Sequence, residues 1–202
     1  MKKTGLALLF TFIATFLFAA ENNSLLELFP EQLINSHGRK IDTKTALQGK
    51  KLVAVYYSAS WCGPCRGFTP NLVKFYKQVA KSNGLEVILV GSDRKEKDMM
   101  NYMKKDSMPW LAVPFDDPSN AGLKKLGKVR GIPQLTILDS TGKIVSQNAR
   151  WDVVILGKDA VKAWMSPDYT PKTYQDYKDS SQNNKNKKSS KKSSKKKRSK
   201  KR

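Results

Sequence analysis

The 202-residue chain has only two cysteines, Cys62 and Cys65, and one histidine, His37. A structural zinc site needs four ligands, usually two cysteine pairs or one pair with two histidines, and this chain cannot supply them. Covalent haem attachment needs a histidine directly after the second cysteine, where Arg66 stands instead. The sequence therefore predicts no metal site and no cofactor, and it leaves the work of the cysteine pair to be explained.

The C-terminal end lacks both acidic and apolar residues. No aromatic or aliphatic residue follows Tyr177, and the stretch from Lys185 to Arg202 holds twelve of the chain's 38 basic residues and no acid. We expect residues 168–202 to form a disordered Lys/Ser-rich tail, because such a composition cannot bury enough apolar surface to order itself. A tail of this kind can bind anionic lipid or an envelope polymer electrostatically. Aromatic residues do not alternate with the lysines, so specific nucleic-acid binding is not expected.

The N-terminal end lacks charge after its first lysines. Residues 1–20 have Lys2 and Lys3 followed by an uncharged run to Ala20, a pattern typical of a secretory signal peptide and similar to bacterial ones. We expect an exported protein of the periplasm or cell envelope, with secretion as an alternative. The bulky Phe18 lies three residues from a cut after Ala20. An uncleaved membrane anchor therefore stays open, since the run is at the short limit for a span.

The middle of the chain, residues 21–167, reads as one α/β domain with a central mixed β-sheet flanked by helices. β-prone runs predict strands at 50–60 and 85–93, and two more within 133–147 that meet at a turn at 140–142. Helical spacing predicts helices at 62–82, 94–106, 119–129 and 157–165. We also expect an N-terminal helix and a short hairpin within residues 21–49, and a kink at Pro70.

The two cysteines are three residues apart, between a predicted strand and a predicted helix. A static disulfide here would close a very small loop and contribute little stability. Redox exchange suits the pair better, because Cys62 would lie at the positive end of the helix dipole, where a thiolate is favoured. Arg66 adds a positive charge, and Cys65 lies one turn further in. We therefore expect Cys62 to attack a substrate disulfide and Cys65 to resolve the mixed disulfide.

Neighbouring residues fit this interpretation. Gly63 permits a tight turn, and Pro64 suits the first helical turn because it lacks an N–H group. Trp61 is either a docking surface beside the pair or a plain core aromatic. Trp110 is either a further substrate contact or a packing residue.

Three features resemble thioredoxin. They are "WCGPC" at the end of a strand, Pro70 in the following helix, and "GIP" at 131–133 before a late strand. The resemblance implies a thioredoxin-like fold with a cis peptide bond at Pro133. It also implies that the backbone of Ile132 pairs with an extended substrate segment.

A finer resemblance is to the tryparedoxin/nucleoredoxin branch, over about residues 35–150. The stretches "SASWC", "CRGFTP" and "MPWLAVPF" carry it. Two features depart from the pattern: Gly-Pro lies between the cysteines, where this branch often has Pro-Pro, and Tyr56 replaces the buried acid of thioredoxins. Tyr56 or Glu86 could pass a proton to Cys65, or both could be ordinary strand residues.

The sequence thus predicts a monomeric thiol–disulfide oxidoreductase of the cell envelope that reduces protein disulfides. A membrane or thioredoxin-type electron donor would return it to the dithiol form, because the periplasm is kept oxidising. The alternative is a polyanion-binding envelope protein on a thioredoxin scaffold, with the basic tail as its functional element. The substrate, the donor and the direction of electron flow stay open.

Overall fold

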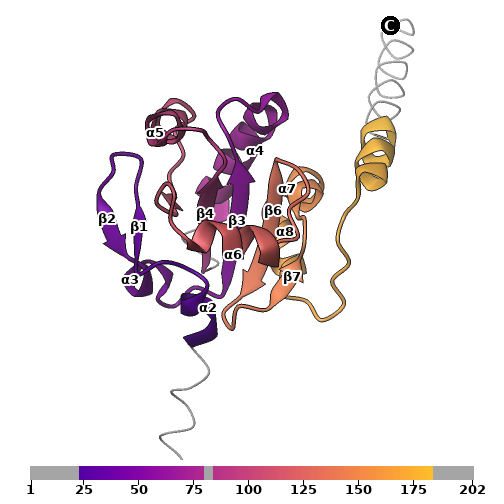
Figure 1. Cartoon of the computed structure of the whole chain (residues 1–202). Helices are drawn as coiled ribbons and strands as arrows, with labels where there is room; N and C mark the ends of the chain where they lie inside the picture. Colours follow the sequence, from indigo (N-terminus) through magenta and orange to yellow (C-terminus); the bar gives the residue numbers. More distant parts are fainter. Residues whose placement is uncertain (1–22, 80–83, 184–202) are drawn as a thin grey trace, which may run out of the picture.

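The computed structural model describes residues 23–79 and 84–183, and these form a mixed β-sheet with helices against both faces (Figure 1). The seven strands are β1 (Gln32–Ile34), β2 (Lys40–Asp42), β3 (Leu52–Ser58), β4 (Leu85–Gly91), β5 (Leu111–Ala112), β6 (Gln134–Asp139) and β7 (Ile144–Ser146). Their order in the sheet is β2-β1-β5-β4-β3-β6-β7. The β3–β4 and β4–β5 pairs are parallel, and the other pairs are antiparallel. The predicted α/β architecture is confirmed.

The helices form two groups. They are α2 (Asn23–Glu27), α3 (Thr43–Leu47), α4 (Gly63–Val79), α5 (Glu96–Lys105), α6 (Ser119–Leu126), α7 (Arg150–Leu156), the 3₁₀ turn η1 (Gly157–Asp159) and α8 (Ala160–Trp164). Side chains of α4, α5, α7 and α8 share one buried cluster with the sheet. Side chains of α2, α3 and α6 share the other. The two clusters lie on the two faces of the sheet.

Strand β3 lies inside the sheet between β4 and β6, and all seven of its residues are buried. Its side chains alternate between the two clusters: Ala54 and Tyr56 join the first, and Val55 and Tyr57 join the second. A strand covered on both faces needs apolar residues at every position, which explains the continuous run in the sequence.

Helix α4 runs through Pro70 and buries one apolar face against the sheet. Phe68, Leu72 and Phe75 lie on that face at helical spacing. Pro70 is exposed, on the opposite side. The helix begins directly after Cys62, so the packing of this face also sets the position of the cysteine pair.

The structure differs from the sequence prediction in three short elements and one helix. Helices α3 and α7 and strand β5 were not predicted, and the helix expected at 157–165 is a 3₁₀ turn followed by α8. Each of the missed elements has seven residues or fewer, too short for a clear period in the sequence. Gly157 has a φ of 54°, a conformation that favours glycine, and it ends α7.

Residues 168–183 were predicted to belong to the tail, but the structure places them against the domain. The hydroxyl of Tyr169 and the backbone N–H of Lys172 donate to Asp152 on α7, and residues 174–183 are helical. The predicted signal at 1–20 and the basic stretch 185–202 lie outside the described residues. Within residues 23–79 and 84–183, no helix has the length and apolar character needed to cross a membrane.

Candidate active site

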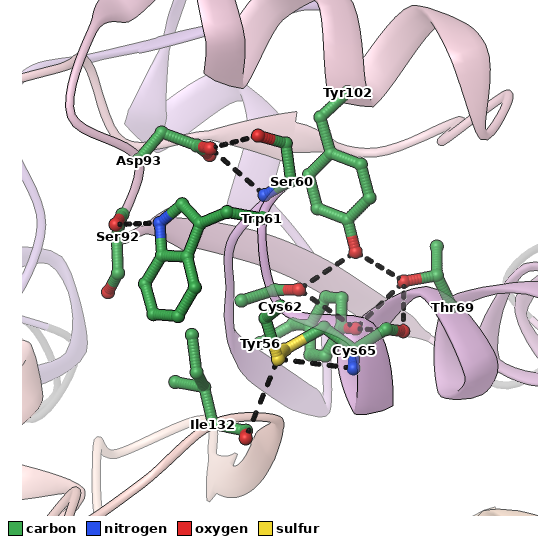
Figure 2. Close-up of a disulfide and its surroundings, with 11 residues drawn as sticks. Tyr56, Ser60, Trp61, Cys62, Cys65, Thr69, Ser92, Asp93, Tyr102 and Ile132 are labelled. Atoms are coloured by element: carbon green, nitrogen blue, oxygen red, sulfur yellow. Dashed lines mark hydrogen bonds between the residues drawn. A yellow bond between two sulfur atoms is a disulfide. The ribbon is translucent and has the colours of Figure 1, made fainter.

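Three chain segments meet at one edge of the sheet. Because β3 and β4 are parallel, their carboxyl ends, Ser58 and Gly91, lie side by side. The antiparallel strand β6 begins at the same edge, where Gln134 pairs with Tyr57. The loop after β3, the loop after β4 and the segment before β6 therefore converge on the cysteine pair (Figure 2).

Cys62 and Cys65 form a disulfide, with their Cα atoms 5.2 Å apart. Cys62 is the last residue before α4, and its Sγ accepts a hydrogen bond of 3.2 Å from the backbone N–H of Cys65. The side chain of Cys62 is 5% exposed and that of Cys65 is fully buried. Only Cys62 therefore offers its sulfur to a partner at the surface, which supports the predicted order of attack and resolution.

The peptide bond between Ile132 and Pro133 is cis, as the resemblance implies. The Ile132 carbonyl oxygen lies 3.7 Å from Cys62 Sγ, and the Ile132 side chain packs against both cysteines. Pro133 is buried and Ile132 is half-buried. In the described part of the chain the N–H of Ile132 has no backbone acceptor, so it is available to a substrate strand.

Trp61 lies on the surface beside the disulfide, with 60% of its side chain exposed. Its indole Nε1–H donates a 3.0 Å hydrogen bond to the carbonyl of Ser92, which holds the ring beside the disulfide (Figure 2). The core-aromatic alternative is therefore wrong. Gly63, Pro64 and Arg66 are all exposed on the first turn of α4.

Trp110 does not reach the surface. Its side chain is 1% exposed and packs edge-on against Tyr56 and Tyr76, with ring centroids 6.2 and 5.6 Å away. The prediction that Trp110 contacts substrate is wrong, and the packing alternative holds. It follows α5 in a segment that enters the core, because a large apolar ring gains more free energy there than at the rim.

The sequence interpretation missed Asp93, which follows β4. Its carboxylate Oδ1 accepts hydrogen bonds from the backbone N–H of Ser60 at 2.9 Å and from the Ser60 hydroxyl at 2.6 Å (Figure 2). The loop that carries Trp61 and Cys62 is thereby tied to the next strand. A polar residue directly after a buried strand was the signal that could have found it.

Four buried hydroxyl groups lie beneath Cys65. The Thr69 hydroxyl donates to the Cys65 carbonyl at 2.9 Å, and lies 2.9 Å from the Tyr56 hydroxyl and 2.7 Å from that of Tyr102. The hydroxyl of Ser58 donates to Tyr56 and bonds Tyr102. Burial raises the pKa of Tyr56, and the neighbouring Tyr102 raises it further, so its hydroxyl stays protonated. This network occupies the place of the missing acid.

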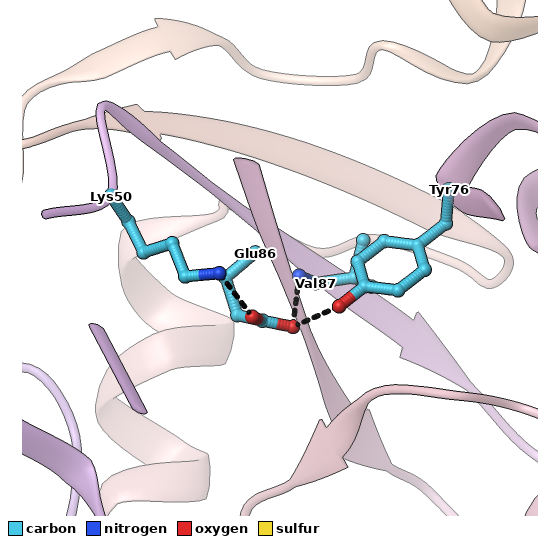
Figure 3. A network of polar contacts seen from close by, with 4 residues as sticks. All are labelled: Lys50, Tyr76, Glu86 and Val87. Carbon is cyan, nitrogen blue, oxygen red and sulfur yellow. Dashed lines mark hydrogen bonds and ion pairs between the residues drawn. The ribbon is translucent and has the colours of Figure 1, made fainter. Parts of the chain in front are cut away.

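Glu86 lies at the opposite end of β4. It pairs with Val53 on β3. It lies five residues before Gly91, which at ~3.3 Å per residue places it roughly 16 Å from the end of β4 that adjoins the site. Its carboxylate accepts a hydrogen bond of 2.7 Å from the Tyr76 hydroxyl and forms an ion pair with Lys50 at 2.9 Å (Figure 3). Glu86 is therefore a partner of Lys50 and Tyr76, and the idea that it serves Cys65 is wrong.

Comparisons with known proteins agree with this geometry. Residues 49–144 match the family described as thioredoxin-like. Tryparedoxin of Trypanosoma brucei brucei is 46% identical over 108 residues, covering 52% of this chain and 72% of that protein. Probable nucleoredoxin 1 of Arabidopsis thaliana is 38% identical over 148 residues, which is 73% of this chain. The structure of tryparedoxin II from C. fasciculata superposes with a TM-score of 0.63 at 32% identity, covering 77% of this chain and 97% of that one.

The nucleoredoxin relative is a much longer protein. This chain spans 24% of its length, so the match concerns one part of it.

Proposed function

Because the chain belongs to the thioredoxin-like family, in the branch of the tryparedoxins and nucleoredoxins, we propose that it is a monomeric protein-disulfide reductase. One observation carries the proposal. Cys62 ends its loop at the start of α4, with the Cys65 N–H on its sulfur and the Ile132 carbonyl 3.7 Å away. A thiolate at Cys62 would be stabilised by that N–H and by the helix dipole.

The reaction begins from the dithiol form. The Cys62 thiolate attacks one sulfur of a substrate disulfide, an intermolecular disulfide forms, and the other substrate sulfur leaves as a thiolate that takes up a proton. Cys65 then loses its proton and attacks Cys62 Sγ, which releases the second substrate thiol and leaves the Cys62–Cys65 disulfide of the structure. Two electrons pass from the pair to the substrate in each turnover.

The substrate strand would lie against Ile132 and Trp61. The free N–H of Ile132 offers a backbone hydrogen bond to an extended segment, which holds the scissile disulfide next to Cys62. The exposed ring of Trp61 supplies apolar contact area beside it. Arg66 sits next to Cys65 on the exposed side of α4, where its charge favours a thiolate at the pair.

We place this activity in the cell envelope, on the strength of the leader-like residues 1–20. A membrane or thioredoxin-type donor would supply the electrons there, since an oxidising compartment does not return a disulfide to the dithiol form by itself. The localisation is tested by fractionating cells that produce the full chain, and a cytoplasmic protein with residues 1–20 intact would contradict it.

Single cysteine variants test the proposed reaction. Cys65→Ser keeps the attacking thiol but cannot resolve, so incubation with insulin should accumulate a covalent insulin adduct and turnover should stop. Cys62→Ser should give neither adduct nor turnover. Mass spectrometry of the trapped species checks both results. An adduct on Cys65 in the Cys62→Ser protein, at the rate of the other variant, would contradict the assigned order.

The direction of electron flow is tested by the reduction potential of the pair. Equilibration in thiol buffers followed by thiol trapping measures it. A value of about −270 mV supports a reductase, and one of about −120 mV would mark an oxidase and overturn the proposed direction.

A second candidate rests on the twelve basic residues after Asn184: binding of a polyanion by the tail. It predicts salt-sensitive binding to anionic vesicles or polymers that survives replacement of both cysteines by serine. The two activities are compatible, because they use different parts of the chain.

A further inference from the structure

Residues 169–183, which we call the root of the C-terminal segment, pack against α7. Asp152, which is fully buried, accepts hydrogen bonds from Trp164 Nε1 at 3.1 Å, the Tyr169 hydroxyl at 2.6 Å and the Lys172 N–H at 2.8 Å. Separating the three donors from this buried carboxylate costs free energy, because each donor would lose its acceptor. The chain is therefore held at the domain surface as far as Lys172.

Aromatic rings hold the next turn of chain in the same place. Trp151 of α7 stacks on Tyr177 with centroids 5.0 Å apart, and its ring lies 5.2 Å from that of Tyr174. The helical residues 174–183 consequently lie beside α7 (Figure 1, yellow). The basic residues begin at Lys185, two positions after the last described residue.

This root lies at the catalytic end of the sheet. Strand β6 starts at that end, next to Pro133, and β7 runs back toward it. The backbone N–H of Ala149 donates to the Leu135 carbonyl at 2.7 Å, which places the start of α7 two residues from Pro133 along β6. The eighteen residues from Lys185 to Arg202 have a contour length of at most roughly 60 Å, ample to reach Cys62 from there.

The segments that border the disulfide and the start of α7 carry basic residues. We call these residues the basic rim: Arg66 on α4, Lys128 and Arg130 before Ile132, and Arg150 at the start of α7. Helices α4 and α6 have no acidic residue, and the loop from Gly127 to Pro133 has none. Asp106 is an acid close to this surface: burial raises its pKa, and the charges of Lys105 and Arg66 oppose that rise.

The opposite side of the site is mixed in charge. There residues 93–98 hold three acids and three bases in a row: Asp93, Arg94, Lys95, Glu96, Lys97 and Asp98. The excess of basic residues therefore lies on the segments around Ile132 and the start of α7, the helix that the C-terminal segment contacts. Fields of one sign around a cleft raise the local concentration of oppositely charged partners.

We propose that the substrate is an acidic protein with an accessible disulfide, recruited by the tail and seated on the basic rim. This rests on the reductase function proposed above. A protein is favoured over a membrane because of where the root lies. A flat anionic surface drawn to both tail and rim would cover Cys62, whereas an acidic protein brings its disulfide to that end.

The test uses three synthetic peptides with the same central disulfide, flanked by glutamates, by lysines or by serines. The full chain is compared with a variant of equal length in which the twelve Lys/Arg of residues 185–202 are replaced by glutamine. At low ionic strength the full chain should reduce the acidic peptide with a kcat/KM about tenfold above the basic one. That preference should fall steeply with added salt. The neutral-tail variant should lose most of the preference through a higher KM, with its rate on the serine peptide unchanged.

Each other outcome has a definite meaning. Equal rates on the acidic and basic peptides would overturn the inference while the reductase function stands. A preference that survives in the neutral-tail variant would overturn the role of the tail. If anionic phospholipid vesicles bind the full chain and suppress reduction of the acidic peptide, the tail serves a membrane and the inference fails. Failure to reduce even the serine peptide would instead contradict the proposed reductase function.

Discussion

At the scale of single residues, the position of Cys62 depends on side chains outside its own loop. Asp93 holds the backbone and hydroxyl of Ser60, and the Ser92 carbonyl holds the indole of Trp61. Both anchors follow β4, so the sulfur of Cys62 is placed by the neighbouring strand as much as by α4. A thiol poised for exchange needs such placement, because attack requires alignment with the substrate disulfide.

Asp93 is therefore expected to matter for both stability and rate. Asp93→Ala removes the acceptor for two Ser60 donors and should lower the free energy of unfolding by about 1–3 kcal/mol. Asp93→Asn keeps an acceptor oxygen and should cost less. Urea denaturation of both variants, with insulin reduction rates alongside, measures this. Equal losses in the two variants would show that the charge of Asp93, rather than its hydrogen bonds, is what counts.

Tyr56 stands where thioredoxins have a buried acid, but its hydroxyl cannot do what a carboxylate does. Its hydroxyl is buried, bonded to Thr69 and Ser58, and kept protonated because burial raises its pKa. Such a group cannot act as a carboxylate base at neutral pH. The network instead holds the Cys65 carbonyl through Thr69, which fixes the first turns of α4.

At the scale of elements, the C-terminal segment and α7 behave as one unit. Asp152 ties the chain after α8 to α7, and the stack of Trp151 on Tyr177 continues the contact. The domain consequently extends further along the chain than the apolar pattern of the sequence indicates. The basic stretch from Lys185 to Arg202 therefore follows a segment that is held against α7.

The variant Asp152→Ala tests this unit. It leaves three donors without an acceptor and should destabilise the domain by roughly 3 kcal/mol, at about 1 kcal/mol or more for each unmade bond. Tyr169→Phe removes only one of these bonds and should cost about 1 kcal/mol. Hydrogen exchange should also show residues 169–183 released in the alanine variant. Unchanged protection of that segment would mean that the aromatic stack alone holds it.

At the scale of the whole molecule, two apolar clusters on the faces of one sheet carry several buried tyrosines. Burial raises the pKa of Tyr56, Tyr57, Tyr76 and Tyr169 above the ordinary value near 10. The folded state therefore keeps these hydroxyls protonated at a pH where the unfolded chain ionises them.

The stability of the domain should accordingly fall at high pH. Below pH ~10 both states bind the tyrosine protons and stability is unaffected by them. Above it the unfolded state loses protons that the folded state keeps, so unfolding is favoured by up to about 1.4 kcal/mol per pH unit for each fully buried tyrosine, Tyr56 and Tyr57. Urea midpoints between pH 8 and 11.5 should show this decline. Replacement of Tyr57 by Phe should make it shallower, and a midpoint that stays constant to pH 11 would contradict the assignment.

Much of this protein could be predicted from local sequence alone. The buried run of β3, the amphipathic α4 and the turn between β6 and β7 each depend on residues within one element, and each was predicted. The pair Cys62 and Cys65 was assigned as the redox centre because its spacing and its place before a helix are local features too. The cis bond at Pro133 came only from the resemblance, since sequence by itself gives an X–Pro bond low odds of cis.

Only the tertiary structure decided which side chains face the disulfide. Ser60 meets Asp93 across 33 positions, and Cys62 meets Ile132 across 70. No local pattern records such contacts, because they follow from the pairing order of the strands. The same reason applies to Trp110. Tryptophan is found both at surfaces and in cores, and the burial of this one depends on its contacts with Tyr56 and Tyr76. The sequence by itself determined the fold class and pointed to thiol–disulfide exchange at the cysteine pair, because both depend on local patterns. The packing of distant segments decided what surrounds the sulfur of Cys62 and where the C-terminal segment meets the domain.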